Sequence, residues 1–541
     1  MSRWLPLSLP LLLLGLLAVL LTLPVLAVGV SWFQFGAESA QVLGEMTRTV
    51  LPGYAATSLV LCAAVALGVG VVGLTVACAV TLFDFPGRRW MEWALLLPLA
   101  MPAYVVAYAY TDFLQFSGPF QSWLRDTFAL QGRVFPEVRN TAGAAWVFTF
   151  SLYPYVYLLA RTALGERGSH LMEAARLLGA PLRRRVTEVA LPLARPAVAA
   201  GVALALMETL ADFGVASYFG IQTFTTGIYK AWLSMDNRLA AAQLATVLLA
   251  WVALLLKLEQ GAQQRMRFAA TRSGATESTP VRLTGRWAAL AVALCVAPVA
   301  LGFVLPVLFM LRPLVHGWGE LPWHPFLGWA RNSLWLAGMS AALATALALW
   351  LAFAVRVRPG RSWGAWFTRG VVQLASLGYA VPGAVVVVGL LLPVGWLQAV
   401  APQTSAGYWV TATALGIVWA YMVRFVAVAL QSVQSGYARV PASLDDSARM
   451  LGVSVIQLVT RVHGPLLKKP AAAALLLVLV DVMKELPATL VLRPFNTDTL
   501  AVMAYQLARD ERLGEAALPS LALVLVGLLP VVLLSRTLRR D

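Results

Sequence analysis

Four acidic residues lie within long apolar stretches of this 541-residue chain, and their spacing repeats. Glu208 and Asp212 are four residues apart, and so are Asp481 and Glu485. On a continuous helix, residues i and i+4 share one face, so each pair would present two neighbouring carboxylates. An ionisable side chain inside a bilayer costs roughly 2.5–3.5 kcal/mol even on the most lenient scale, which makes such residues candidates for function. We therefore interpret the four acids as the lining of a translocation path.

A structural ion-pair network is the alternative interpretation of these acids. Lys484 is three residues after Asp481, and Arg424 lies in a different apolar stretch. Four acids against two bases leave an excess of negative charge, which favours the path. Carboxylate oxygens suit a hard trivalent cation, and an organic cation would also be attracted.

The apolar stretches that must position these acids are long enough to cross a membrane. Hydrophobic residues make up 60% of the chain and charged residues only 12%, which excludes an ordinary soluble globular protein. A spanning helix needs about 20 mainly apolar residues, and twelve stretches meet this requirement. They lie near residues 5–30, 56–83, 93–112, 142–160, 196–219, 239–257, 287–311, 332–355, 370–393, 410–433, 470–492 and 517–535.

The distribution of basic residues predicts the orientation of these spans. The formal charge of +16 comes mostly from Lys and Arg in every second loop, so we place both termini in the cytoplasm. This pattern does not favour nucleic acid as a partner, because no polar stretch is long enough for a basic soluble domain. None of the five lysines follows a glycine, so we expect no nucleotide-binding P-loop and no enzyme active site in this chain.

The chain repeats itself at an offset of 273 residues. This shift places Glu208 on Asp481, Asp212 on Glu485 and Thr226 on Thr499. Many transporter folds are duplicated in this way. We therefore predict two homologous six-span halves, residues 1–259 and 287–541, joined by a cytoplasmic linker at 260–286.

One cytoplasmic loop occurs in both halves, at residues 165–195 and 434–469. In each loop the sequence predicts two short helices separated by Gly179 or Gly452. Glycine favours a helix end because the last residue often has the left-handed backbone conformation, which suits a residue without Cβ. The expected helix-start signals are Ser169, Pro181, Ser443 with Asp446, and Ser454 with Gln457. A hairpin at the same place in each half predicts a docking surface, and an amphipathic loop lying on the membrane is the alternative.

The loop in the first half resembles the E-A-A loop of permease subunits of ATP-binding-cassette importers. It has E-A-A at 173–175, a glycine at 179 and L-P at 191–192, whereas the second copy has D-S-A at 446–448. The resemblance implies that residues 180–187 and 453–460 are coupling helices that dock on an ATPase. The implied coupling residues are Glu173, Ala174, Ala175, Gly179, Ala180, Pro181, Asp446, Ala448, Gly452, Val453 and Ser454.

The stretches at 208–229 and 484–496 are similar to the fused permeases of ferric-iron importers. This resemblance implies an all-α membrane protein with twelve transmembrane helices in the type I importer permease (MetI-like) fold. It also implies a bacterial inner-membrane location and, as partners, two copies of a separate ATPase and a periplasmic ferric-iron-binding protein. ATP and magnesium would bind to the ATPase, with no cofactor on this chain. Related permeases carry thiamine, phosphonates, sulfate or polyamines.

Two further features have competing interpretations. Tyr104, Tyr108 and Tyr110 with Asp112 could form a ferric phenolate site, but we interpret them as an aromatic belt at the membrane surface, and we assign no metal site. The turn D-F-P-G-R-R at 84–89 is similar to a motif of ion-gradient-driven secondary carriers. Such a carrier is the competing class, but it has no pair of E-A-A loops.

Overall fold

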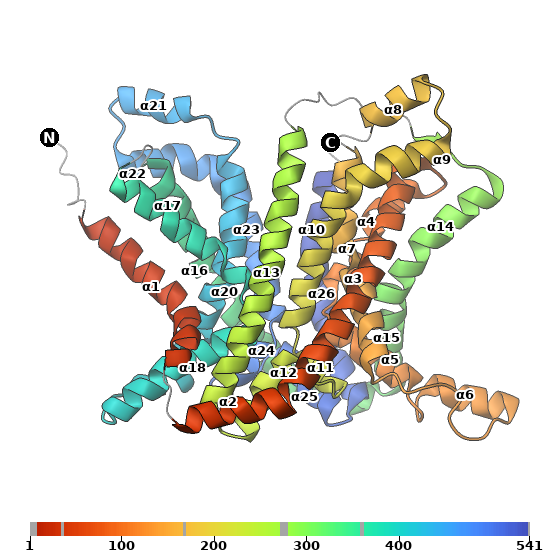
Figure 1. Ribbon diagram of the computed structural model, residues 1–541, viewed down its shortest axis with the longest axis horizontal. Helices are drawn as coiled ribbons and strands as arrows, with labels where there is room; N and C mark the ends of the chain where they lie inside the picture. Colours follow the sequence, from red (N-terminus) through yellow and green to blue (C-terminus); the bar gives the residue numbers. More distant parts are fainter. Residues whose placement is uncertain (1–7, 34–36, 166–168, 271–279, 358–361, 539–541) are drawn as a thin grey trace. The chain divides into compact units, whose positions relative to one another are not determined.

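The computed structural model describes residues 8–33, 37–165, 169–270, 280–357 and 362–538. These residues are almost entirely helical, and by packing they fall into two units that we describe separately (Figure 1). Unit 1 comprises residues 1–39, 236–246 and 324–502. Unit 2 comprises residues 40–235, 247–323 and 503–541.

The helices that belong to unit 1 come from the first span and from the second half of the chain. They are α1 (Ser8–Val30), η1 (Ser31–Phe33), α16 (Trp323–Val357), α17 (Trp363–Ser376), η8 (Gly378–Ala380), α18 (Gly383–Val400), α19 (Ala406–Thr411), α20 (Ala414–Tyr437), α21 (Ala442–Met450), α22 (Val455–Gln457), η9 (Leu458–His463), α23 (Gly464–Lys484) and α24 (Pro487–Leu492).

Unit 2 holds most of the first half together with three helices that follow the linker or close the chain. Its elements are α2 (Ala37–Thr49), α3 (Leu51–Leu82), β1 (Phe83–Asp84), α4 (Arg88–Ala94), η2 (Leu97–Ala100), α5 (Ala103–Leu114), α6 (Pro119–Phe128), α7 (Thr141–Ala163), α8 (Ser169–Leu177), α9 (Leu182–Arg184), η4 (Arg185–Ala190), α10 (Leu191–Ala211), α11 (Gly214–Tyr218), α12 (Phe224–Tyr229), η5 (Lys230–Ser234), β2 (Val281–Arg282), α14 (Gly285–Val299), η6 (Ala300–Val304), α15 (Leu305–His316), η7 (Trp318–Glu320) and α26 (Leu513–Leu538). Four helices have residues in both units: α2, α16, α13 (Arg238–Ala270) and α25 (Leu500–Arg509).

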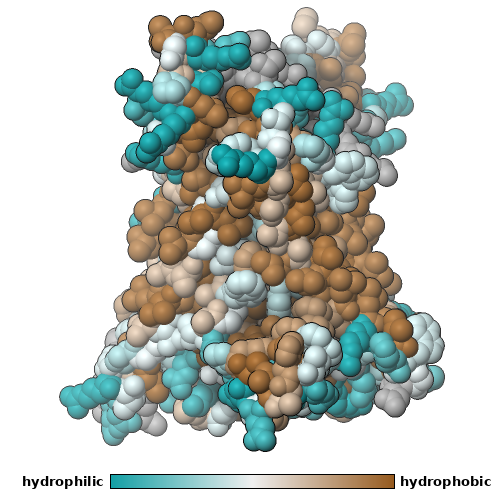
Figure 2. Space-filling view, turned by 90° about the vertical axis from the view of Figure 1, so that its right-hand side faces the viewer, coloured by the Kyte–Doolittle hydropathy of each residue, from teal (hydrophilic) through white to brown (hydrophobic). Residues whose placement is uncertain are grey.

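Ten helices are long and apolar enough to cross a membrane, and one bent pair, Arg88–Ala100 with Ala103–Phe128, brings the number to eleven among the described residues. The predicted span at 470–492 corresponds to α23, which ends at Lys484 and carries several charged side chains. The face shown in Figure 2 has a band of hydrophobic residues with hydrophilic residues at both ends. The predicted all-α membrane fold is confirmed, and the ten or eleven candidate spans are roughly consistent with the twelve that the sequence predicts.

The helices repeat in register. Segments η4 and α10 of the first half start and end 273 residues before η9 and α23 of the second half. Even the π-helical turn is duplicated, at Arg185–Ala190 and at Leu458–His463. The two sequence halves therefore encode the same series of elements.

Packing does not follow these halves. In unit 1, α1 packs against α17 and α18, which come from the second half. In unit 2, α14 packs against α3, and α15 against α5 and α26. The sequence repeat defines the halves, whereas side-chain contacts place the first helix of each half with helices of the other.

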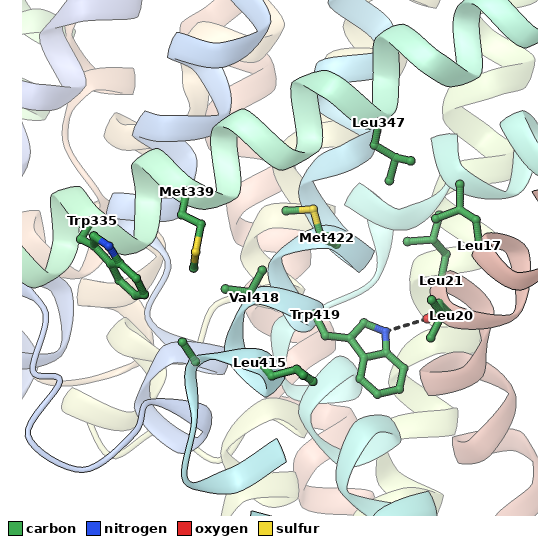
Figure 3. A pocket seen from close by; sticks show the side chains of 11 residues that line it. Leu17, Leu20, Leu21, Trp335, Met339, Leu347, Leu415, Val418, Trp419 and Met422 are labelled. Atoms are coloured by element: carbon green, nitrogen blue, oxygen red, sulfur yellow. Dashed lines mark hydrogen bonds between the residues drawn. The ribbon is translucent and has the colours of Figure 1, made fainter. Parts of the chain in front are cut away.

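A proline and a glycine explain how α1 is seated in unit 1. Pro24 has no N–H, so the carbonyl of Leu20 loses its helical partner, and the indole Nε1 of Trp419 donates to it at 2.8 Å (Figure 3). Gly389 of α18 lies directly against the Pro24 backbone, because a Cβ built there would be 1.9 Å from the Pro24 oxygen. An unsatisfied carbonyl is costly in a bilayer, so the Trp419 contact favours this position of α1.

The predicted linker at 260–286 is partly ordered. Helix α13 continues to Ala270, and Val281–Arg282 pairs as a parallel strand with Phe83–Asp84. Residues 271–279 lie outside the described part of the chain. The described ends of the predicted linker thus form regular structure, and its role as a cytoplasmic joint between the halves stays a prediction.

Candidate transport path and coupling loops

The span that carries Glu208 and Asp212 is broken at the second acid. Helix α10 ends at Ala211, Asp212 is extended (φ −69°, ψ 135°), and the short helix α11 begins at Gly214. The Asp212 Oδ1 accepts hydrogen bonds from the backbone N–H groups of Val215 (2.8 Å) and Ala216 (3.4 Å). The carboxylate therefore caps the start of α11, where unpaired N–H groups favour a negative charge.

The second half is broken in the same way. Helix α23 ends at Lys484, Glu485 is extended (φ −70°, ψ 120°), and α24 begins at Pro487. The Glu485 carboxylate accepts from the N–H groups of Ala488 and Thr489, each at 3.0 Å, and from the Thr489 hydroxyl at 2.7 Å. An acid at the repeat-equivalent position thus performs the same capping in both halves.

These breaks correct the predicted geometry of the acid pairs. Because each helix ends before the second acid, Glu208 with Asp212 and Asp481 with Glu485 do not share one face of a continuous helix. Glu208, Asp212 and Asp481 are partly buried, and Glu485 is only 5% exposed. Whether any of the four contacts a substrate stays a prediction.

Glu485 is in an ion pair. Arg424 Nη1 of α20 donates to Glu485 Oε1 at 2.8 Å, and both side chains are buried. Gly383, at the start of α18, makes room for the pair, because a Cβ there would lie 2.8 Å from Glu485 Oε1. The first half has Ser151 at the position equivalent to Arg424. At this position an arginine therefore balances the acid of the break in the second half, whereas the first half has a serine.

The tyrosines of α5 are buried, so their interpretation as an exposed aromatic belt is wrong. Tyr104, Tyr108 and Tyr110 are at most 5% exposed. Tyr110 donates to the Leu301 carbonyl at 2.7 Å, and the Tyr108 ring packs edge-on against Tyr218 of α11 at 4.7 Å. Their rings fill the interior of unit 2 beside the broken span.

A bidentate ion pair in unit 2 was not foreseen. Arg139, just before α7, donates to both Glu511 oxygens at 2.7 and 2.8 Å and to the Tyr218 hydroxyl at 3.0 Å. The hydrogen bond from Arg139 lowers the pKa of the Glu511 carboxyl. The two residues are 372 positions apart, and neither lies in a motif, so no sequence signal would have paired them.

Both predicted loops contain a short helix that ends at a left-handed glycine. Gly179 after α8 has φ +79°, and Gly452 after α21 has φ +72°. The next N–H in each loop, from Ala180 or Val453, returns to the carbonyl of an E-A-A alanine at 2.9 or 3.1 Å: Ala175 in the first loop and Ala448 in the second. The predicted turn chemistry of these loops is confirmed.

The element after each glycine is not a separate short helix. The chain from Leu182 to Ala211 is one helix of 30 residues, interrupted only by the π-helical turn η4. The capping box of Ser454 with Gln457 is confirmed, whereas α21 begins at Ala442 and leaves Ser443 inside its first turn. The Ser169 side chain lies outside the described residues.

Each short helix ends in two exposed apolar side chains. Leu177 and Leu178 are 84% and 88% exposed, and Met450 and Leu451, which are their repeat equivalents, are 91% and 83% exposed. Glu173 and Asp446 are also exposed. Sequence reasoning missed the apolar pairs, although their position directly before a helix-ending glycine in both copies was a usable signal.

Among the residues that the structure describes, no three His, Cys, Asp or Glu side chains gather into a set that could hold a metal ion.

Comparison with known proteins agrees with this architecture. Residues 70–265 match the family described as "Binding-protein-dependent transport system inner membrane component". The chain is 25% identical to the Fe(3+)-transport system permease protein FbpB 2 of Haemophilus influenzae, over 87% of this chain and 88% of that protein.

Relatives with other printed substrates align with less than half of this chain. The sulfate transport system permease protein CysT of Escherichia coli is 29% identical over 42% of this chain and 79% of its own length. The putative 2-aminoethylphosphonate transport system permease protein PhnU of Salmonella choleraesuis is 26% identical over 46% and 82%. Residues 70–265 therefore contain a domain that matches the binding-protein-dependent transport system inner membrane components, and over most of its length the chain is similar to a transport system permease.

Proposed function

We propose that the chain is the membrane subunit of an ATP-driven importer in which two copies of a separate ATPase dock on α8 and α21. The observation that carries this proposal is the pair of apolar side chains exposed at the end of each helix, at repeat-equivalent positions. Exposed apolar side chains at matching sites are typical of a surface that a partner covers. In this proposal the loops and both termini lie in the cytoplasm of a bacterial inner membrane.

Continuous helices connect these docking sites to the broken spans. In the first half, the helix Leu182–Ala211 begins three residues after Gly179 and ends directly before Asp212. Thirty helical residues extend about 45 Å, so displacement of the loop moves the break as part of one rigid element. The second half has the same arrangement between Gly452 and Glu485. ATP-driven closure of the ATPase pair would thereby open and close the path from the cytoplasmic side.

The apolar pairs provide the first test. Changing Leu177 and Leu178 to Ser in one loop, and Met450 and Leu451 to Ser in the other, removes the most exposed apolar side chains of both loops. We expect co-purification of the ATPase to fall about tenfold, because each large side chain contributes roughly 1.5–3 kcal/mol on full burial. Unchanged co-purification in the fourfold variant would contradict docking at these sites.

A control is available in the same chain. Phe495 is 92% exposed, but it lies in the loop between α24 and α25, outside both docking loops. Phe495→Ser should leave ATPase binding unchanged. Equal losses with Phe495→Ser would mean that exposed apolar residues act nonspecifically.

For the substrate we propose ferric iron delivered by a periplasmic binding protein. One relative that aligns over most of the chain is a ferric-iron permease. The break in the first half carries Asp212, and Ser151 replaces the arginine that occupies position 424 in the second half. A local negative charge favours a cation over sulfate or a phosphonate. Thiamine, also a cation, is the alternative within the same class, and an ion-gradient-driven carrier is the alternative of another class.

Uptake of radiolabelled ferric iron in cells without their own importers tests this proposal. The cells express the chain, its ATPase and its binding protein, and Asp212→Asn is compared with the parent chain. Asparagine is as good a helix cap as aspartate, so the variant should assemble while its uptake falls about tenfold if the charge attracts the substrate. Competition by thiamine or sulfate would reassign the substrate, and uptake that survives inactivation of the ATPase would favour the secondary carrier.

A further inference from the structure

The docking helix of the second half rests on a cluster of buried polar side chains in unit 1. Arg356, at the end of α16, donates from Nε to Asp445 Oδ2 of α21 at 2.6 Å. His463 of η9 pairs through Nε2 with the other carboxylate oxygen at 2.8 Å, and its Nδ1 lies 3.1 Å from the Tyr437 hydroxyl. Asp445, His463 and Tyr437 are at most 9% exposed. We call these four residues the ionic seat.

The hydrogen bonds of the ionic seat are mutually consistent. With a neutral imidazole, Nε2–H donates to Asp445 and Nδ1 accepts from Tyr437, so no buried proton of the ring lacks an acceptor. Arg356 Nη2 also donates to the carbonyls of Val440 and Pro441, each at 2.9 Å. The residues that enter α21 are thereby fixed to α16, which crosses the membrane.

The carboxyl group stays charged in this setting. Burial raises the pKa of Asp445, but the hydrogen bonds from Arg356 and His463 outweigh this effect and hold the pKa below its usual range. The charge of Arg356 balances that of the carboxylate, so the seat requires both residues.

The first half fills the equivalent positions with apolar residues. At an offset of 273, Tyr437, Asp445 and His463 correspond to Leu164, Met172 and Ala190, and Arg356 corresponds to Phe83. Leu164, Met172 and Ala190 are buried. The helix α8 therefore buries the apolar side chain of Met172 at the position where α21 buries the ion-paired Asp445, and we call these buried apolar residues of the first half the apolar seat.

The two seats differ in how strongly they fix the orientation of the helix above them. Hydrogen bonds weaken steeply when donor and acceptor are misaligned, so the ionic seat defines one orientation of α21. Apolar burial is non-directional and depends on the area removed from water, so α8 can shift on its seat at low cost. The two loops thus expose similar apolar side chains, but polar contacts anchor α21 and apolar burial anchors α8.

We propose that the ionic seat makes α21 the stiffer of the two docking helices, and that Arg356, Asp445 and His463 are positioning residues for coupling to the ATPase. The apolar seat leaves α8 free to adapt as the partner moves. The role in coupling rests on the proposed function, whereas the difference in stiffness belongs to this chain alone.

Hydrogen exchange on the full chain in lipid nanodiscs, without ATPase, tests the difference in stiffness. We expect amides of residues 445–453 to exchange about tenfold more slowly than the equivalent amides of residues 172–180, because opening α21 breaks charge-assisted hydrogen bonds. Asp445→Asn should remove most of this difference. Equal protection of both loops in the parent chain would overturn the proposal, whatever the ATPase does.

An exchange of seats tests the role in coupling. Arg356→Phe, Tyr437→Leu, Asp445→Met and His463→Ala together give the second half the residues of the first, without leaving a buried charge unpaired. We expect the fourfold variant to assemble and bind the ATPase, but to transport several-fold less substrate per ATP hydrolysed. A matched control, Met172→Leu, keeps the apolar seat and should leave this ratio unchanged.

The two proposals fail in different ways. If the parent chain does not bind the ATPase, the proposed function fails even when the exchange rates differ. If the fourfold variant binds the ATPase and keeps the parent ratio of transport to hydrolysis, the positioning role is overturned and the proposed function stands.

Discussion

Replacing Arg424 by Leu should remove most of the correctly assembled chain from the membrane. The substitution leaves the Glu485 carboxylate buried without its cation, at 5% exposure, in the region between α18, α20 and α24. Breaking a buried pair in this way typically costs 3–5 kcal/mol. Native proteins are stable by only about 5–15 kcal/mol, so we expect at least about a tenfold loss of folded chain. Size-exclusion chromatography of detergent-extracted membranes, with fluorescence detection, measures this loss.

A second change should restore assembly. Glu485→Gln in the Arg424→Leu background removes the stranded charge and retains an amide oxygen that can accept from the N–H groups of Ala488 and Thr489. The matched control is Ser151→Ala, at the equivalent position of the first half, where the Ser151 hydroxyl is buried without a hydrogen-bond partner. This control should leave the yield unchanged. Normal amounts of the Arg424→Leu chain would show that the pair does not hold the break together.

The repeat explains why much of the fold could be predicted from the sequence. Each half carries the same residues at its helix ends and starts. A glycine lies at 179 or 452, and a proline lies directly after the start of α10 or α23. Because these residues act through local backbone geometry, their effect does not depend on distant contacts. Packing of α1 with the second half, by contrast, depends on Gly389 and Trp419, which are more than 350 residues away from it.

Hydropathy alone does not predict the breaks in the two spans. The residues around each break remain apolar, so the average hydropathy stays high although the helix ends. The local signal is an acid followed two residues later by Gly214 or Pro487, where a carboxylate can cap a new helix. An i, i+4 spacing places two acids on one face only when the helix is continuous, and here each helix ends directly before the second acid of its pair.

The motifs and the local sequence do not predict the ionic seat, because its partners are assembled by tertiary contacts. Asp445 stands beside the motif residue Asp446, and His463 has no acid among its immediate neighbours. Only the packing of α21 against η9 and the end of α16 brings these side chains together. A comparison of the two halves would have signalled it, since polar residues replace Met172 and Ala190 in the second copy.

Replacing Gly179 and Gly452 together by Val should uncouple ATP hydrolysis from transport. Both glycines have positive φ, and a Cβ built at either would meet nothing within 4 Å, so the effect comes from backbone conformation and not from a clash. The left-handed region costs an L-residue about 1–2 kcal/mol, and a β-branched residue more. The helix ends of α8 and α21 would rearrange and displace the exposed apolar pairs. We expect uptake to fall about tenfold while the chain still assembles.

Two controls separate loop geometry from general strain. Asn tolerates the left-handed region, so Gly179→Asn with Gly452→Asn should retain most of the uptake. Gly87 has φ +82° and equally open space around it, but lies at the start of α4, outside both loops. Gly87→Val imposes the same backbone strain and should leave the ratio of transport to hydrolysis unchanged. If the Val double variant transports as well as the parent, the turn after each docking helix plays no part in coupling, and the continuous helices that follow must move without it.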